Sequence, residues 1–108
     1  MNTGREVPVA CTLSADELPA RRQQIRSLGK DGLLSVEHDA RRAIFRFRSG
    51  AQMRRRIDEI VEAESRCCAF LDFRVVEEAG GATRLTISAP GGGEPALSEF
   101  AALFTAAR

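Results

Sequence analysis

The sequence predicts an α+β fold, a two-layer sandwich in which helices cover one face of an antiparallel sheet. Two pairs of strand-like segments, each joined by a short turn signal, indicate two hairpins. Three segments with apolar residues at steps of three and four indicate helices that pack on the sheet. The expected order is β-α-β-β-α-β-β-α, whose first six elements match the ferredoxin-like order. The length of 108 residues predicts a single domain, 1–108.

The first strand and helix are expected in the N-terminal third of the chain. Residues 1–6 are polar, and we expect them to be disordered. Residues 7–13 read as a short strand, which Pro8 places at a sheet edge or at a strand start. The capping-box pattern of residues 14–17 then predicts a helix that ends near Leu28, with Gly29 as its stop.

The first hairpin is expected to join residues 32–38 to residues 43–48. The first of these strands is expected to run through Leu34 and Val36. The second alternates strictly, so that its small and aromatic residues face inward and its arginines outward. The inward set is Ala43, Phe45 and Phe47.

The central helix has the clearest periodic pattern in the chain. Ser49 as N-cap and Gln52 three residues later fit a capping box, so the helix is expected from Ala51 to about Phe70. One face of this helix carries Met53, Ile57, Ile60, Val61, Glu64, Cys68 and Leu71. Glu64 is the exception on this stripe, because a buried carboxylate needs a partner or its pKa rises.

A second hairpin and a last helix complete the predicted fold. Residues 73–77 and 83–89 are expected to pair across a turn that contains two glycines. A helix from about Pro95 to Ala106 is then expected to bury Leu97, Phe100, Ala101 and Phe104. An uncovered edge or face of the sheet would favour a homodimer.

Composition excludes several classes of protein. A net charge of +1 argues against strong binding to nucleic acid or to an anionic membrane. The sequence contains no apolar run of membrane-helix length and no apolar region typical of a signal peptide, so we expect a cytoplasmic protein. In that compartment thiols stay reduced, and the odd count of three cysteines also argues against a disulfide framework.

Two adjacent cysteines on the central helix form the best candidate site. Glu64 lies three residues before Cys67 and four before Cys68, so these side chains can meet on one helix surface. Cys11, at the end of the predicted first strand, would approach them from below if that strand is central. Thiolates select thiophilic ions, so we expect Cys67, Cys68 and Cys11, helped by Glu64, to bind an ion such as Zn(II), Cu(I), Hg(II) or As(III).

Other interpretations of these residues stay open at the level of sequence. Free cysteine is commonly buried as a small hydrophobe, which would make the protein a non-catalytic dimerisation or interaction module. The chain lacks the C-x₂₋₄-C spacing of zinc sites. A disulfide from Cys11 to the pair would instead indicate a thiol-redox protein. Glu64 could simply pair with a sheet arginine such as Arg46 or Arg84.

The thiol motif resembles that of a group of small, largely uncharacterised bacterial proteins. The likeness rests on residues 11–13, on Glu64-Ser65-Arg66-Cys67-Cys68-Ala69-Phe70-Leu71-Asp72-Phe73, and on residues 85–91. The shared pattern is C-T-L … E-x-x-C-C-x-F-L-x-F … L-x-I-x-x-P. The resemblance implies cytosolic proteins linked to thiophilic-metal stress, without an established activity. It selects Cys11, Glu64, Cys67 and Cys68; the proline of the common C-C-P-F form is Ala69 here, which predicts a longer helix.

Overall fold

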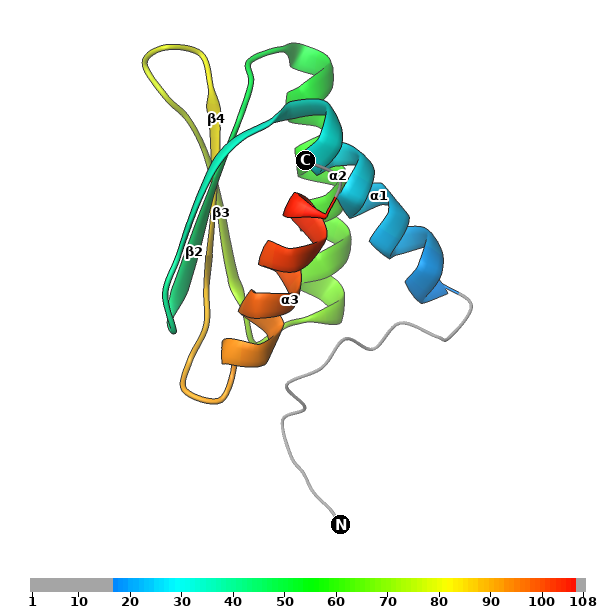
Figure 1. The fold of residues 1–108 in the computed structure, drawn as a ribbon, viewed down its shortest axis with the longest axis vertical. Coiled ribbons are helices and arrows are strands. Elements are labelled where there is room, and N and C mark those ends of the chain that lie inside the picture. The colour runs from blue at the N-terminus through cyan, green and yellow to red at the C-terminus, as the bar shows by residue number, and fades with distance from the viewer. Residues whose placement is uncertain (1–16, 107–108) are drawn as a thin grey trace.

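A computed structural model describes residues 17–106 as three helices packed on one face of a four-stranded antiparallel sheet (Figure 1). This is the two-layer α+β arrangement that the sequence predicts. The elements in chain order are α1 (Glu17–Gly32), β1 (Leu33–His38), β2 (Arg42–Phe47), α2 (Ala51–Cys67), β3 (Asp72–Glu77), β4 (Thr83–Ser88) and α3 (Glu94–Thr105). The strand expected over residues 7–13 and the disorder expected over residues 1–6 lie outside the described residues.

The sheet has the strand order β1-β2-β4-β3, so the two hairpins meet through their second strands. β2 and β4 pair antiparallel, with Phe45 opposite Leu85 and Ala43 opposite Ile87. Ala43, Phe45 and Phe47 of β2 are all fully buried beneath the helices, which confirms the predicted inward face of this strand. No described helix covers the opposite face of the sheet, which carries charged side chains such as Arg46, Glu37 and Glu78.

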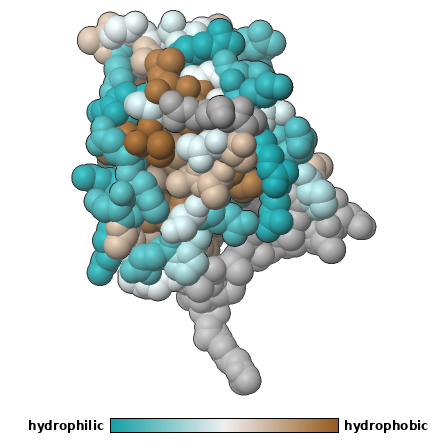
Figure 2. All heavy atoms as spheres, in the orientation of Figure 1, coloured by the Kyte–Doolittle hydropathy of each residue, from teal (hydrophilic) through white to brown (hydrophobic). Residues whose placement is uncertain are grey.

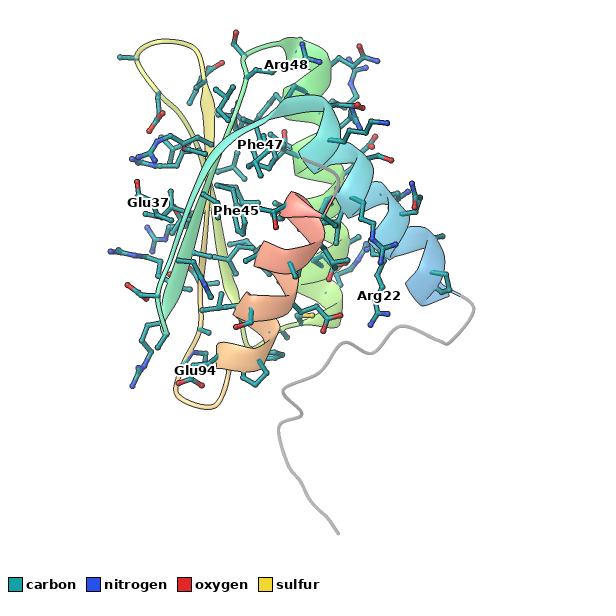
Figure 3. The ribbon with its side chains drawn as sticks, viewed as in Figure 1. Arg22, Glu37, Phe45, Phe47, Arg48 and Glu94 are labelled. Carbon is teal, nitrogen blue, oxygen red and sulfur yellow. The ribbon has the colours of Figure 1, made fainter. Side chains whose placement is uncertain are left out.

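An aromatic cluster in the core joins the sheet to α3. The Phe104 ring lies 4.6 Å from the Phe45 ring and 5.4 Å from the Phe47 ring, measured between centroids. Figure 3 shows Phe45 and Phe47 between the sheet and the helices, with Glu37 on the outer side of the sheet. In Figure 2, hydrophobic residues are visible between the two layers, while hydrophilic residues line the outer sides of both.

The first helix continues past the predicted stop at Gly29 and ends at Gly32. Gly29 is buried at the contact between α1 and α3, where a Cβ atom would lie 1.9 Å from the Phe104 carbonyl oxygen. Gly29 therefore allows α1 and α3 to approach each other closely, and it does not end α1. The prediction of a stop was wrong because local sequence does not distinguish these two uses of glycine.

The strand β1 departs from simple alternation at its start. Its register with β2 shifts between Leu33 and Ser35, which leaves Leu34 outside the regular pairing. Leu34 is consequently 54% exposed, whereas Val36 packs against the core. A bulge of this kind changes which face of the sheet a side chain points to. The predicted strand is therefore present, but of Leu34 and Val36 only Val36 packs against the core.

The central helix begins at Ala51 as predicted, but its capping residue and its C-terminal end differ from the prediction. The N-cap is Gly50 and not Ser49, and no side chain within the described part of the chain caps the first turn. The helix ends at Cys67, several residues before Phe70, because Cys68 adopts φ −117° and ψ 66°. The chain then turns, with the Leu71 N–H donating to the Cys68 carbonyl oxygen at 3.0 Å. The absence of proline at Ala69 does not prolong the helix, contrary to the expectation.

The last helix buries the predicted set of residues, except that Leu103 takes the place of Ala101. Leu97, Phe100 and Phe104 are buried as expected, while Leu103 is buried and Ala101 only partly so. Across residues 17–106, no helix combines the length and apolar character needed to cross a membrane.

Candidate functional site

Cys68 and Glu64 come together at the C-terminal end of α2, as their spacing predicts. The Cys68 sulfur lies 3.7 Å from Oε1 of Glu64, and both residues are almost fully buried, with 3% and 2% of their surface exposed. The backbone produces this contact, since the Cys68 N–H still donates to the Glu64 carbonyl oxygen at 2.7 Å. The last helical bond thus holds the two side chains on one inward face.

The Cys68 sulfur is part of a disulfide. It carries no proton in this state, so its 3.7 Å approach to Glu64 is a van der Waals contact. On reduction, the same geometry would let the thiol donate a weak hydrogen bond to the carboxylate. The sulfur of a second cysteine therefore lies within covalent reach of Cys68.

The other two predicted ligands fall outside what the structure describes. Cys67 is the last residue of α2, but its side chain lies outside the described set, and Cys11 lies outside residues 17–106. Within the described part of the chain, no three His, Cys, Asp or Glu side chains are grouped to hold a metal ion. The structure thus brings together Glu64 and Cys68 of the predicted set.

Arg21 of α1 contacts this site, although the sequence did not predict it as the partner of Glu64. Its Nη1 atom donates to Oε2 of Glu64 at 3.3 Å. The expected partners Arg46 and Arg84 are wrong, because both bind Glu78 on the opposite side of the sheet. A signal for Arg21 was present in the sequence: it precedes the buried Ile25 by four residues and so shares the inward stripe of α1.

Burial raises the pKa of Glu64 above its ordinary value, and the attraction of the Arg21 guanidinium only partly opposes this effect. Removing water from a carboxyl disfavours its charged form, whereas a nearby cation and a hydrogen bond favour it. The site therefore contains an acid whose proton is held more tightly than that of an exposed glutamate, in contact with a sulfur atom.

The raised pKa of Glu64 predicts a pH dependence of stability. On acidification the folded state takes up this proton before the unfolded chain does, so the contribution to stability is complete below pH 4.5 and is lost as the pH rises through the folded-state pKa. We expect the free energy of unfolding of the native protein, minus that of Glu64→Gln, to increase as the pH falls from 7 toward 4.5. Urea titrations at several pH values measure this difference.

The control for this experiment is Glu62→Gln, which removes an exposed carboxylate from the same helix. It matches the change in charge without touching the buried pair. A difference between the native protein and Glu64→Gln that stays constant across the pH range would contradict the prediction.

The position of Cys68 at a helix C-terminus determines which chemistry the site favours. The carbonyl end of a helix carries a partial negative charge, which disfavours a thiolate and favours a cation. Arg66, an exposed cation in the last turn, opposes this field. The arrangement is therefore better suited to holding a positive ion than to activating a cysteine nucleophile.

Comparisons with protein-family models, with curated proteins and with solved structures found no match to this chain.

Proposed function

We propose that the reduced protein binds a soft metal or metalloid ion through the sulfurs of Cys68, Cys67 and Cys11, with the Glu64 carboxylate as an additional ligand. The observation that supports this most directly is the buried Cys68 sulfur, which has a second sulfur within covalent reach and a carboxylate oxygen at 3.7 Å. Two or more thiolates beside one carboxylate form a donor set for Zn(II), Cu(I), Hg(II) or As(III) rather than for Mg(II) or Ca(II).

Burial and electrostatics both favour such an ion. The site is shielded from water, so the charge of a cation and that of its thiolates would neutralise each other at low dielectric. The helix C-terminus adds a favourable interaction with the cation. The Arg21 guanidinium opposes the ion to a smaller degree, because it is already paired with Glu64.

The proposal requires the thiols to be reduced, since a disulfide sulfur is not a thiolate ligand. This requirement is consistent with a location in the cytoplasm, where glutathione and thioredoxin systems keep cysteines reduced. We therefore propose a cytoplasmic protein that takes up the ion in its reduced form and loses it on oxidation.

Native mass spectrometry of the reduced protein tests this function. We expect one Hg(II), Cu(I), As(III) or Zn(II) ion to remain bound per chain in the presence of a competing small thiol. The double variant Cys67→Ser/Cys68→Ser should lose the ion, and Glu64→Gln should bind it more weakly. Ser65→Ala, an exposed position on the same turn, is the control. Undiminished binding by the double cysteine variant would overturn the proposal.

A thiol–disulfide redox function is the second candidate, and the disulfide at Cys68 specifically favours it. In such a protein the dithiol and disulfide forms would interconvert at the potential of the surrounding thiol pool. Equilibration with glutathione buffers and quantification of free thiols would measure that potential. A value far below that of the cytosolic pool would identify the disulfide as structural instead.

The dimerisation module is less well supported by the described residues. Among them, Leu34 and Val76 are the large hydrophobic side chains that are exposed, at 54% and 43%, and they lie on opposite edge strands. Between these strands the open sheet face carries ion pairs such as those from Arg46 to Glu37 and Glu78. A homodimer therefore remains a proposal that analytical ultracentrifugation would test.

A further inference from the structure

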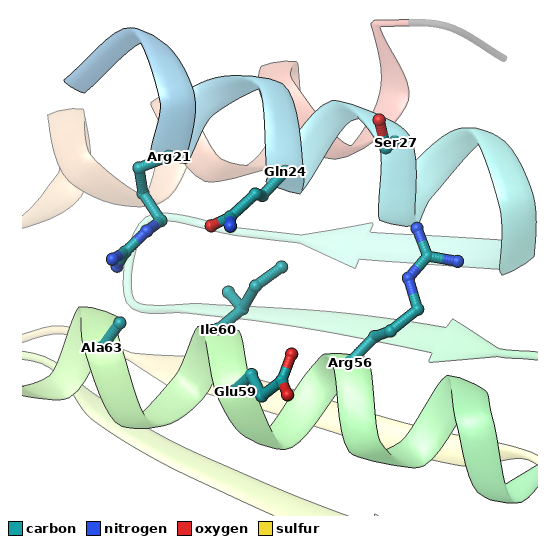
Figure 4. A pocket seen from close by; sticks show the side chains of 7 residues that line it. All are labelled: Arg21, Gln24, Ser27, Arg56, Glu59, Ile60 and Ala63. Atoms are coloured by element: carbon teal, nitrogen blue, oxygen red, sulfur yellow. The ribbon is translucent and has the colours of Figure 1, made fainter. Parts of the chain in front are cut away.

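A cavity of about 270 Å³ lies between α1 and α2. Arg21 connects it to the thiol site formed by Glu64 and Cys68. Its walls come from one face of each helix, with residues at steps of three and four. The lining residues are Arg21, Gln24 and Ser27 of α1 and Arg56, Glu59, Ile60 and Ala63 of α2 (Figure 4). Among the described residues, Arg21 alone belongs to both the cavity and the thiol site, through its ion pair with Glu64.

Guanidinium groups stand at the two ends of this groove. Figure 4 shows Arg21 across from Ala63 at one end and Arg56 reaching toward α1 beside Ser27 at the other. Each arginine has an ion pair through its Nη1 atom: Arg21 with Glu64 at 3.3 Å, and Arg56 with Asp31 at 3.0 Å. A guanidinium has five N–H donors in a planar fork, so one such contact leaves capacity for an incoming carboxylate.

The middle of the groove has a different character. Its floor contains the buried Ile60, which suits aliphatic carbon atoms. The Glu59 carboxylate lies between the two arginines, and Gln24 provides an amide on the opposite wall (Figure 4). A carboxylate at this position favours a positively charged group on the ligand.

We propose that this groove binds a small aliphatic amino acid that carries a carboxylate at each end, with its ammonium group on Glu59. Carboxylates fit better than phosphates, because each end arginine is already partly neutralised by an acidic residue and Glu59 repels a doubly charged group. This ligand is independent of the proposed ion, because the described residues that line the groove include no cysteine.

The axial spacing of the lining residues on α2 limits the ligand to a short chain. Arg56 and Ala63, which mark the two ends on α2, are seven residues apart, or about 10 Å along the helix axis. An extended chain of about seven carbons with terminal carboxylates has a comparable length. α-Aminopimelate combines that length with one ammonium group, and it is the probe that we would use first.

Isothermal titration calorimetry with three compounds of equal chain length tests the proposal on the whole protein. α-Aminopimelate has both carboxylates and the ammonium, pimelate lacks the ammonium, and α-aminoheptanoate lacks one carboxylate. We expect α-aminopimelate to bind one to one, and each of the others to bind at least tenfold more weakly, because each loses a charged hydrogen bond. Failure of α-aminopimelate to bind at millimolar concentration, or equal binding of all three, would overturn the proposal.

Two variants test which residue binds each charged group of the ligand. Arg56→Gln should abolish the preference for α-aminopimelate over α-aminoheptanoate, and Glu59→Gln should abolish the preference for α-aminopimelate over pimelate. Both positions are on the outer part of α2, so their replacement should leave the fold intact. Arg55→Gln is the matched control, because Arg55 is exposed and does not line the groove. Retention of both preferences in both variants would overturn the assignment.

Discussion

Gly29→Ala should destabilise the protein by about 2–3 kcal/mol, although alanine is ordinarily the better helix residue. A Cβ atom at this position would lie 1.9 Å from the carbonyl oxygen of Phe104 and 2.7 Å from its carbonyl carbon. Both are backbone atoms of α3, so no side-chain rotation relieves the overlap. The helices α1 and α3 would have to separate, which would open the core between them.

Urea denaturation of Gly29→Ala and Gly80→Ala side by side would measure this effect. Gly80 lies in the turn between β3 and β4, and a Cβ atom there would have no neighbour within 4 Å among residues 17–106. The same chemical change is therefore expected to leave the urea midpoint almost unchanged at Gly80 and to lower it clearly at Gly29. Equal midpoints for the two variants would show that α1 and α3 do not approach each other this closely.

Phe104→Ala should have the larger effect, a loss of about 3–5 kcal/mol. The ring is fully buried and lies against Phe45 and Phe47, so its removal leaves a cavity where the sheet meets α3. A loss of this size is a large part of the total stability of about 5–15 kcal/mol that small domains have. We therefore expect a strong decrease in the melting temperature.

The comparison for Phe104→Ala is Phe70→Ala, which removes the same ring from a partly exposed position after α2. Thermal unfolding followed by circular dichroism should show a much smaller decrease in the melting temperature for Phe70→Ala. A comparable decrease in both variants would mean that the aromatic cluster does not dominate the packing of α3 on the sheet.

Arg21 belongs to both the thiol site and the groove. Its guanidinium pairs with Glu64, whose other oxygen contacts the Cys68 sulfur, and it also closes one end of the groove. The two proposals nevertheless have separate tests, because the cysteine variants leave the groove residues intact and Arg56→Gln leaves the thiols intact. Success or failure of one does not determine the result for the other.

Much of the thiol site could be predicted from the sequence. The spacing of Glu64 and Cys68 placed both on one helical face, and the structure confirms the contact between them. The break in the apolar stripe also identified Glu64 as a buried acid. Its partner was missed, because Arg21 is 43 residues away in the sequence and is brought close only by the packing of α1 on α2.

The sequence by itself determined the α+β class, the two hairpins and the inward faces of β2 and α3. These follow from periodicity, which depends on a residue's near neighbours along the chain. Tertiary structure alone decided the strand order, the use of Gly29 as a helix contact and the pairing of Glu64 with Arg21. Each of these depends on which distant segments pack together, and the local pattern of apolar and polar residues does not specify that choice.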